Sequence, residues 1–314
     1  MNDTHIPEIT DDWILSARGK KNSINPDRPY AFLTEKERTP DGRIEDCVVI
    51  FLTNKECPFH CLMCDLWKNT TGYPLPAGVI PKQIEWALGR LPSAKTLKLY
   101  NSGSFFDPGA IPVRDYERIA SIAKDFDSII VESHPRLINN KCISFRDMLK
   151  PELQVAVGLE TANPELLAKL NKQMTLSDFS QAVNFLTDNG IKSRTFILLK
   201  PPFLSEEDGM DWAERSIDFA FEAGVECCTV IPVRGGNGAM ENLYSMGLYS
   251  PPGIRSLEKV LEYGINLKRG RVFTDTWDLK LFADCPSCSD LRIKRLTEMN
   301  LMQEILPEVE CSYC

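Results

Sequence analysis

The chain has 314 residues, of which 43% are hydrophobic and 25% are charged, and its formal net charge is -8. This composition is typical of a soluble globular protein with one large α/β domain, or one domain and a small appendix. The acidic balance argues against a large unaided nucleic-acid surface, because such surfaces depend on Lys and Arg. No apolar run approaches the ~20 residues of a membrane helix, and the N-terminus lacks a leader pattern. We therefore expect a cytoplasmic protein with no membrane partner.

Short apolar strands alternate with amphipathic helices from residue 48 onward. The pattern predicts strands at 48–53, 96–102, 128–133, 153–161, 193–200 and 227–233. It predicts helices between them at 81–91, 113–126, 144–149, 164–170, 177–189 and 206–223. Such alternation implies right-handed βαβ crossovers and a parallel sheet. Six units predict an α/β fold of the partial (β/α)6 barrel type, with its active site at the carboxyl ends of the strands.

The two flanks of this barrel differ from it in composition. Residues 1–45 are polar and are expected to form an irregular N-terminal extension, so that the barrel itself occupies 46–234. Residues 235–314 are expected to form a small C-terminal region with a helix at 255–268 and a further strand at 271–277.

Three of the eleven cysteines lie close together directly after the first predicted strand. Cys57, Cys61 and Cys64 supply three thiolates, one too few for a closed structural zinc site. A cubic iron–sulfur cluster held by three thiolates keeps one iron open for a substrate or cofactor. The alternative is three unrelated thiols, but clustered cysteines in a chain without a disulfide framework favour metal binding.

The spacing CxxxCxxC resembles that of radical S-adenosylmethionine (SAM) enzymes. The resemblance implies a [4Fe–4S] cluster on Cys57, Cys61 and Cys64 whose open iron chelates SAM. One electron, from a flavodoxin- or ferredoxin-like reductant, then cleaves the sulfonium and gives a 5′-deoxyadenosyl radical that abstracts hydrogen from the substrate. Most such loops carry an aromatic residue before the last cysteine. Here Met63 stands in that position and would pack over the adenine.

Small polar residues end the second predicted strand, where they are candidate contacts of SAM. Asn101, Ser102 and Gly103 would let backbone carbonyls and hydroxyls approach the amino group of SAM. The alternative is an ordinary turn between a strand and a helix.

Charged residues end three later strands and are further candidate contacts of SAM. Glu160 is the leading candidate to accept the ribose hydroxyls, and Glu132 is the second. Lys200 would neutralise the carboxylate of SAM or a substrate phosphate. The alternatives are carboxylates that only pair with lysines and a lysine that is solvated at the surface.

Four late cysteines form two CxxC pairs, Cys285 with Cys288 and Cys311 with Cys314. Their spacing is zinc-ribbon-like, and four thiolates close the coordination shell of a structural metal. The sequence therefore predicts a small cysteine-rich metal-binding module. We favour Zn²⁺ over an auxiliary iron–sulfur cluster, because zinc is the commonest occupant of paired CxxC knuckles.

Several further stretches resemble one family, the radical SAM subunit of archaeosine synthase (RaSEA). They are residues 100–108, 132–135, 158–161, 170–172 and 198–203, together with the two late CxxC pairs. The catalytic subunit of Elongator and the methylthiotransferases are more distantly similar. The resemblance covers nearly the whole chain, from about residue 30 to residue 314.

This resemblance implies a lyase-type or transferase enzyme that acts on tRNA carrying a lysine-adducted 7-deazaguanine. Radical chemistry would cleave a C–N bond in the lysine side chain and leave the formamidine of archaeosine, after a lysine-transferring partner subunit has made the adduct. Two alternatives stay open. One is a radical SAM enzyme that acts on a small molecule or peptide, and the other is a non-catalytic metal-bearing binding module.

Overall fold

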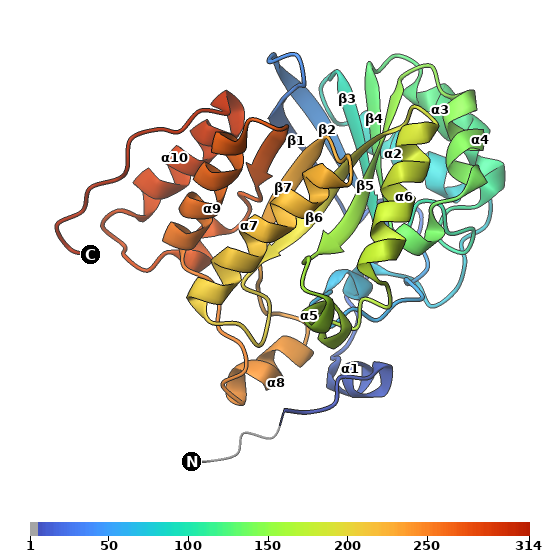
Figure 1. Cartoon of the computed structure of the whole chain (residues 1–314). Coiled ribbons are helices and arrows are strands. Elements are labelled where there is room, and N and C mark those ends of the chain that lie inside the picture. Colours follow the sequence, from blue (N-terminus) through green and yellow to red (C-terminus); the bar gives the residue numbers. More distant parts are fainter. Residues whose placement is uncertain (1–5) are drawn as a thin grey trace.

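One curled sheet of eight strands runs through the molecule, of which the computed structural model describes residues 6–314 (Figure 1). Strands β2 to β8 pair in sequence order and run parallel, whereas β1 pairs with β2 in the antiparallel direction. The strands are β1 (Ala31–Arg38), β2 (Ile44–Leu52), β3 (Thr96–Asn101), β4 (Ser128–Ser133), β5 (Glu152–Glu160), β6 (Lys192–Leu199), β7 (Cys227–Pro232) and β8 (Arg271–Thr274). The sheet is therefore an open, partial barrel with β1 and β8 at its two edges.

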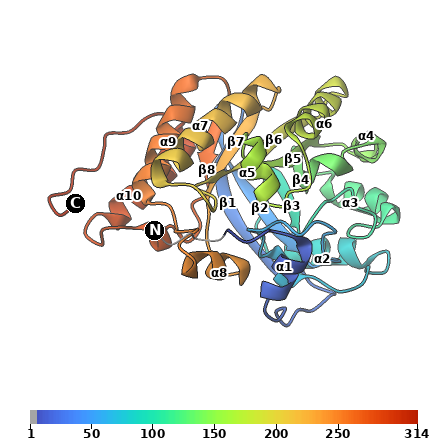
Figure 2. The same ribbon diagram turned by 60° about the horizontal axis from the view of Figure 1, so that its bottom comes forward.

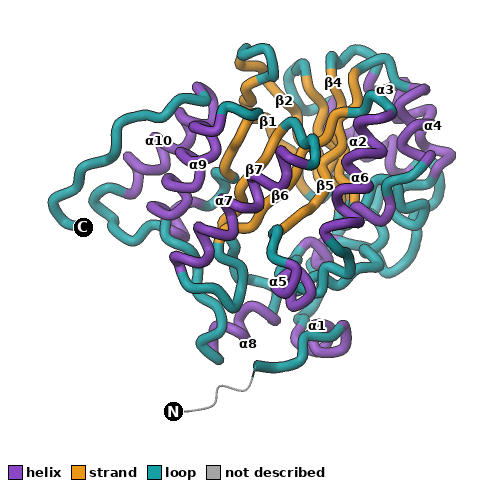
Figure 3. The backbone as a smooth tube through the Cα atoms, viewed as in Figure 1, coloured by secondary structure: helices purple, strands orange, loops and turns teal. Residues whose placement is uncertain are grey.

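Helices cover the outer face of this sheet and the end at which the parallel strands finish (Figures 1 and 3). The described α-helices are α1 (Asp11–Ala17), α2 (Val79–Leu88), α3 (Tyr116–Ala123), α4 (Asn140–Met148), α5 (Pro164–Lys169), α6 (Leu176–Asp188), α7 (Glu206–Glu222), α8 (Ala239–Ser245), α9 (Ile254–Leu267) and α10 (Ser289–Met302). Turned so that this end faces the viewer, the molecule shows α1, α5 and α8 around the mouth of the barrel (Figure 2).

Side chains along each strand alternate between the helices and the inside of the barrel, as the period of a strand requires. In β3, Leu97 and Leu99 are buried in the core under the helices. The residues next to them, Lys98 and Tyr100, instead line a cavity inside the barrel. The main core therefore lies between sheet and helices, and it leaves the inside of the barrel open for a ligand.

The six predicted strands and the helices between them are all present, with shifted ends. Two helix starts show why the sequence marks them well. The side chain of Asn163 caps α5 by accepting from the backbone N–H of Leu166, and the side chain of Ser205 caps α7 by accepting from that of Asp208. Such caps satisfy backbone donors that a helix start leaves without partners.

The expectation of an irregular N-terminal extension is wrong, because residues before 45 include helix α1 and strand β1. The pattern missed β1 since charged residues such as Glu35 and Glu37 occupy its inward face. The predicted later strand is confirmed as β8, and helices α8 and α10 were not predicted. The domain boundaries at residues 46 and 235 stay predictions.

Helix α10 closes the free edge of β8 with side-chain amides. Asn300 accepts from the N–H of Thr274 at 2.9 Å and donates to its carbonyl at 2.8 Å. Gln303 makes the same pair of bonds with Val272, at 2.9 and 2.8 Å. On the other side, Arg38 at the end of β1 donates to a backbone carbonyl of α10. The helix therefore bridges the two edges of the open sheet.

None of the described helices is both long and apolar enough to cross a membrane. The prediction that the chain lacks a leader depends in part on the first five residues, which lie outside the described residues.

Candidate functional site

The three clustered cysteines lie in the loop that follows β2, at the end of the barrel where the parallel strands finish. All three line one cavity of about 990 Å³ that extends into the barrel. Their loop is held from two sides. The backbone N–H of Leu62 donates to the carbonyl of Leu170 at 2.9 Å. The amide of Asn237, in a glycine-rich loop, donates to the carbonyl of Leu62 at 2.7 Å. The loop is thus fixed before any ligand binds.

The chemistry of the three thiols fits a metal cluster. Burial raises the pKa of Cys57 to about 12, and it also raises the pKa values of Cys61 and Cys64. Such thiols ionise only when a strong positive charge replaces the proton, and a bound metal supplies that charge. Among the described residues, only the late cysteines bring their sulfurs within 4.8 Å of one another. The wider spacing of the three early sulfurs suits a cluster rather than a single ion.

Gly103, at the end of β3, lies directly against the first of these cysteines. Its φ angle is +119°, and a Cβ atom there would lie 3.0 Å from the Cβ of Cys57 and 3.2 Å from its sulfur. Both the backbone conformation and the space therefore require glycine. Gly103 was expected to approach SAM, and the structure shows a second reason for its presence.

We expect the substitution Gly103→Ala to displace the Cys57 thiol and to lower the iron content of the reconstituted protein severalfold. The reason is the clash at the Cys57 side chain, added to the strain of a positive φ angle. Gly72→Ala is the control, because no atom lies within 4 Å of its Cβ position. Equal iron content in the two variants would contradict the prediction.

Two polar residues at the end of β3 have side chains without partners. Asn101 lines the cavity, and neither the oxygen nor the nitrogen of its buried amide is bonded within residues 6–314. The hydroxyl of Ser102 is also buried without a partner, but Ser102 does not line the cavity. Buried polar groups normally have partners, so the amide of Asn101 is available to a ligand.

Glu160 ends β5 in a strained conformation that turns it into the cavity. Its φ angle is +68°, and a register shift between Gly158 and Glu160 interrupts the pairing with β6. The carboxylate accepts from the ammonium group of Lys172 at 2.5 Å. A Cβ atom on Gly158 would lie 2.7 Å from both partners. The ion pair thus depends on a glycine beneath it.

Lys172 is the charged residue at this site to which sequence reasoning gave no role. Its side chain lines the cavity beside Cys57 and Cys61. Burial alone would lower the pKa of Lys172, but the carboxylate of Glu160 outweighs this effect and raises it. The ammonium group is therefore charged. The stretch 170–172 belonged to the family resemblance, which was the available signal.

Lys200, which the sequence predicts to neutralise the carboxylate of SAM or a substrate phosphate, lies away from this ion pair, and that role stays a prediction. Its ammonium group is 2.7 Å from the carboxylate of Glu206 and donates to the hydroxyl of Ser250 at 2.8 Å. It does not line the cavity. Its ammonium group joins α7 to the loop before α9, outside the cavity, whereas the side chain of Lys172 lines the cavity. Lys172 is therefore the better candidate to neutralise a ligand carboxylate.

Two further residues complete this end of the cavity. Met63 lines it, as expected of a residue that packs on adenine. His134 stacks on Phe59 with ring centroids 3.8 Å apart, and its Nε2 lies 2.9 Å from the carbonyl of Lys172. Burial lowers the pKa of His134 to about 3, so the ring is neutral. It therefore positions Lys172 without adding charge.

Glu132, at the end of β4, also lines the cavity and accepts from the backbone N–H of Asn101. Removal from water raises the pKa of Glu132 from 4.5 to about 8. A carboxyl whose pKa is higher in the folded state contributes stability below its unfolded pKa and loses it as the pH rises through the folded pKa.

We therefore expect the carboxyl of Glu132 to contribute stability to the cluster-free protein at acid pH and to lose this contribution between about pH 4.5 and pH 8. The loss is on the order of 5 kcal/mol for a shift of this size. The lowered pKa of His134 acts in the opposite direction, because it adds stability as the pH rises from about 3 to 6.5. Glu132→Gln should remove the falling contribution of its carboxyl, so that the unfolding free energy of the variant rises relative to that of the wild type between about pH 4.5 and pH 8. The control is Glu152→Gln, at the exposed start of β5. An unchanged slope in Glu132→Gln would contradict the assignment.

The four late cysteines form a compact group at the start of α10 and the end of the chain. Their sulfurs all lie within 4.8 Å of one another, with Cys285 to Cys311 at 3.9 Å and Cys288 to Cys314 at 3.6 Å. Four thiolates about 2.3 Å from one tetrahedral ion would be spaced about 3.8 Å apart. The group therefore has the dimensions of a closed single-ion site.

Comparisons with known proteins agree with this geometry. No model of a known protein family matches the sequence. The archaeal Elp3 of Methanocaldococcus infernus superimposes with a TM-score of 0.52 at 15% identity, over 70% of this chain and 58% of that one. The chain therefore shares the fold of that protein. The cysteine loop lies at the barrel mouth, where the radical SAM fold was expected to hold it.

Two relatives are named archaeosine synthase subunit beta. The chain is 29% identical to the one from Thermococcus kodakarensis, over 64% of this chain and 65% of that protein. It is 26% identical to the one from Methanosarcina acetivorans, over 64% and 60%. The chain thus spans less than two thirds of the length of either protein. It resembles these two proteins in sequence over the part that they share.

Proposed function

We propose that the chain is a radical SAM enzyme whose Cys57, Cys61 and Cys64 hold a [4Fe–4S] cluster. The observation that carries the proposal is that these thiols share one cavity with the Glu160–Lys172 ion pair. Thiolates, a buried cation and a strand-end carboxylate are the groups that a cluster with bound SAM requires. With both groups bound, the cluster supplies the electron that cleaves SAM to a 5′-deoxyadenosyl radical.

The residues of this chain bind and orient SAM. Lys172 neutralises its carboxylate, and Glu160 offers the ribose hydroxyls the oxygen that Lys172 leaves free. The unpartnered amide of Asn101 bonds the methionine part. Met63 packs on the adenine. Asn101, Glu160 and Lys172 are all buried, which limits the contact of water with SAM on this side of the cavity.

We further propose that the substrate is the lysine-adducted 7-deazaguanine of tRNA, in which the enzyme cleaves a C–N bond of the lysine side chain. The names of the two archaeosine synthase relatives support this substrate, and the word subunit in those names supports a partner chain. That partner would transfer the lysine, and it would also supply basic surface for tRNA that a chain of net charge -8 has in short supply. A flavodoxin- or ferredoxin-like reductant and a cytoplasmic location complete the proposal.

The late cysteines are proposed to hold one structural Zn²⁺. Their mutual distances suit one tetrahedral ion, whereas an auxiliary iron–sulfur cluster would spread the four sulfurs over separate irons. With Zn²⁺ bound, residues 235–314 would form the predicted module. Metal analysis of a variant in which Cys57, Cys61 and Cys64 are all alanine separates the two metals, because only the late site can then hold one.

Anaerobic reconstitution followed by dithionite and SAM tests the proposed function. We expect 5′-deoxyadenosine above background, and archaeosine when tRNA carrying the lysine adduct is added. Formation of 5′-deoxyadenosine without archaeosine would overturn the tRNA substrate and favour a small molecule or peptide. Absence of both products would overturn the enzyme proposal and favour a binding module.

A further inference from the structure

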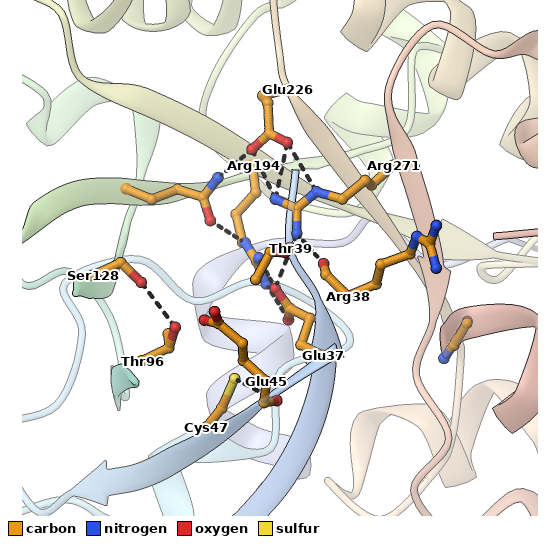
Figure 4. A network of polar contacts seen from close by, with 12 residues as sticks. Glu37, Arg38, Thr39, Glu45, Cys47, Thr96, Ser128, Arg194, Glu226 and Arg271 are labelled. Atoms are coloured by element: carbon orange, nitrogen blue, oxygen red, sulfur yellow. Dashed lines mark hydrogen bonds and ion pairs between the residues drawn. The ribbon is translucent and has the colours of Figure 1, made fainter. Parts of the chain in front are cut away.

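The cavity has a second, charged end that the proposed SAM site does not use. Deep in the barrel, Glu35 and Glu37 of β1 meet Lys98 of β3 and Arg194 of β6, and all four line the cavity. Part of this network, with Glu37 between Arg194 and Arg271, is drawn in Figure 4. Charged side chains are rarely placed inside a barrel unless they are paired, so their partners decide what this end can bind.

The cations of this network are already occupied by protein groups. Lys98 donates to Glu35 at 2.6 Å and also to Glu37. Arg194 donates to Gln154 at 2.8 Å and, through both terminal nitrogens, to Glu37 at 3.1 and 2.5 Å. The side chains of Lys98 and Arg194 are each only 3% exposed. Neither has a free charge to offer an anion.

Glu35 differs from these neighbours. Its side chain is 30% exposed, against 15% for Glu37. Its bond to Lys98 uses one oxygen, and the second oxygen has no partner within residues 6–314. The end of the cavity therefore presents a carboxylate oxygen that is free to accept a hydrogen bond from a ligand. A positively charged donor suits it best, because charge-assisted hydrogen bonds are the strong ones.

The walls between this oxygen and the cysteine loop are aromatic. Tyr100 lies between Phe51 and Phe196, with ring centroids 5.8 and 6.2 Å away, and all three line the cavity. In the register of the paired strands, Glu35 lies opposite Cys47, Cys47 pairs with Thr96, and Thr96 pairs with Ser128. Ser128 precedes Glu132 by four residues on β4. Four residues of strand span about 13 Å. An apolar arm of several carbons fits this distance.

We propose that Glu35 binds a primary ammonium group at the end of an aminoalkyl arm of the substrate. The inference rests on the proposed function only in placing the substrate inside this cavity. The aromatic walls pack against the methylene groups of the arm, while the ammonium group bonds the free oxygen of Glu35. The residue thereby selects substrates with an amine at a fixed distance from the reacting carbon.

The test compares n-pentylamine with n-pentanol as probes, by saturation-transfer NMR on the reconstituted protein with SAM. We expect the wild type to bind the amine about tenfold more tightly than the alcohol, because the ammonium group adds an ion pair to the hydrogen bond that the hydroxyl can also make. Glu35→Gln should abolish this preference. Glu45→Gln on the neighbouring strand is the matched control: Glu45 is also ion-paired, with Arg43, but does not line the cavity.

Equal binding of amine and alcohol by the wild type, or a preference kept in Glu35→Gln, would overturn the proposal. If Glu35→Gln fails to fold, the double variant Glu35→Gln, Lys98→Met is used instead in the same comparison. It removes one positive and one negative charge, so the remaining charges stay balanced. The readout is independent of turnover. An amine preference in a protein that forms no 5′-deoxyadenosine supports the subsite and contradicts only the proposed function.

Discussion

Replacing Cys61 with alanine is expected to abolish SAM cleavage, because two thiolates cannot hold the cluster that the cavity is shaped to take. The cysteine lies in a loop that is fixed by Leu170 and Asn237, so no neighbouring cysteine can move in to replace it. We expect the brown colour and the iron of this site to be lost. The rate of 5′-deoxyadenosine formation should fall at least about a thousandfold, as for loss of a group central to the chemistry.

Cys47→Ala is the control for this result. Cys47 is a buried cysteine of β2 that lies outside the cavity lining, so its loss costs packing only. A Cys61→Ala protein that kept normal iron content and SAM cleavage would disprove the assignment of the three cysteines. Thermal unfolding of both variants shows whether a lost activity reflects a lost fold.

Removing the late metal is expected to loosen α10 and not the cysteine loop. Arg292, one turn into α10, donates to the sulfur of Cys288 at 3.3 Å and pairs with Glu258 of α9. It also donates to the carbonyl of Val309 in the C-terminal tail. The metal site, α9 and the tail thus hold one another, and structural zinc contributes folding free energy directly.

The measurement is hydrogen exchange on Cys288→Ala. We expect faster amide exchange in α10 and β8 together with the loss of one metal ion per chain. The iron bound by Cys57, Cys61 and Cys64 should be unchanged. Cys142→Ala, in the core under α4, is the control for general destabilisation. Unchanged exchange in α10 would show that the metal does not hold this helix.

The barrel could be predicted from the sequence because its parallel strands are buried on the helix side. Runs such as 128–133 and 227–232 are therefore apolar enough to read directly. Strand β1 could not, since one of its faces is the charged interior and its pattern resembles that of a loop. Helix α10 was not predicted for a related reason. The polar residues Asn300 and Gln303 face β8, at positions where an amphipathic helix usually has apolar residues.

The site could be predicted where the spacing of residues along the sequence is enough to indicate the chemistry. It could not be predicted where the chemistry depends on which residues the fold brings together. Three cysteines in one loop predict a cluster without any structure. The position of the lysine in the cavity could not be predicted in this way, because Lys200 comes directly after an apolar strand whereas Lys172 follows a short helix with no local sign of a ligand. Only the fold shows that Glu160 holds Lys172 in the cavity while Glu206 holds Lys200 outside it.

The amide side chains on α10 also have a consequence for self-association. An uncovered edge strand is a template for pairing with another molecule, and natural proteins block such edges. Asn300 and Gln303 occupy the N–H and carbonyl groups of Val272 and Thr274 that a foreign strand would need. A chain truncated before α10 would therefore expose the unpaired edge of β8 and form aggregates through it.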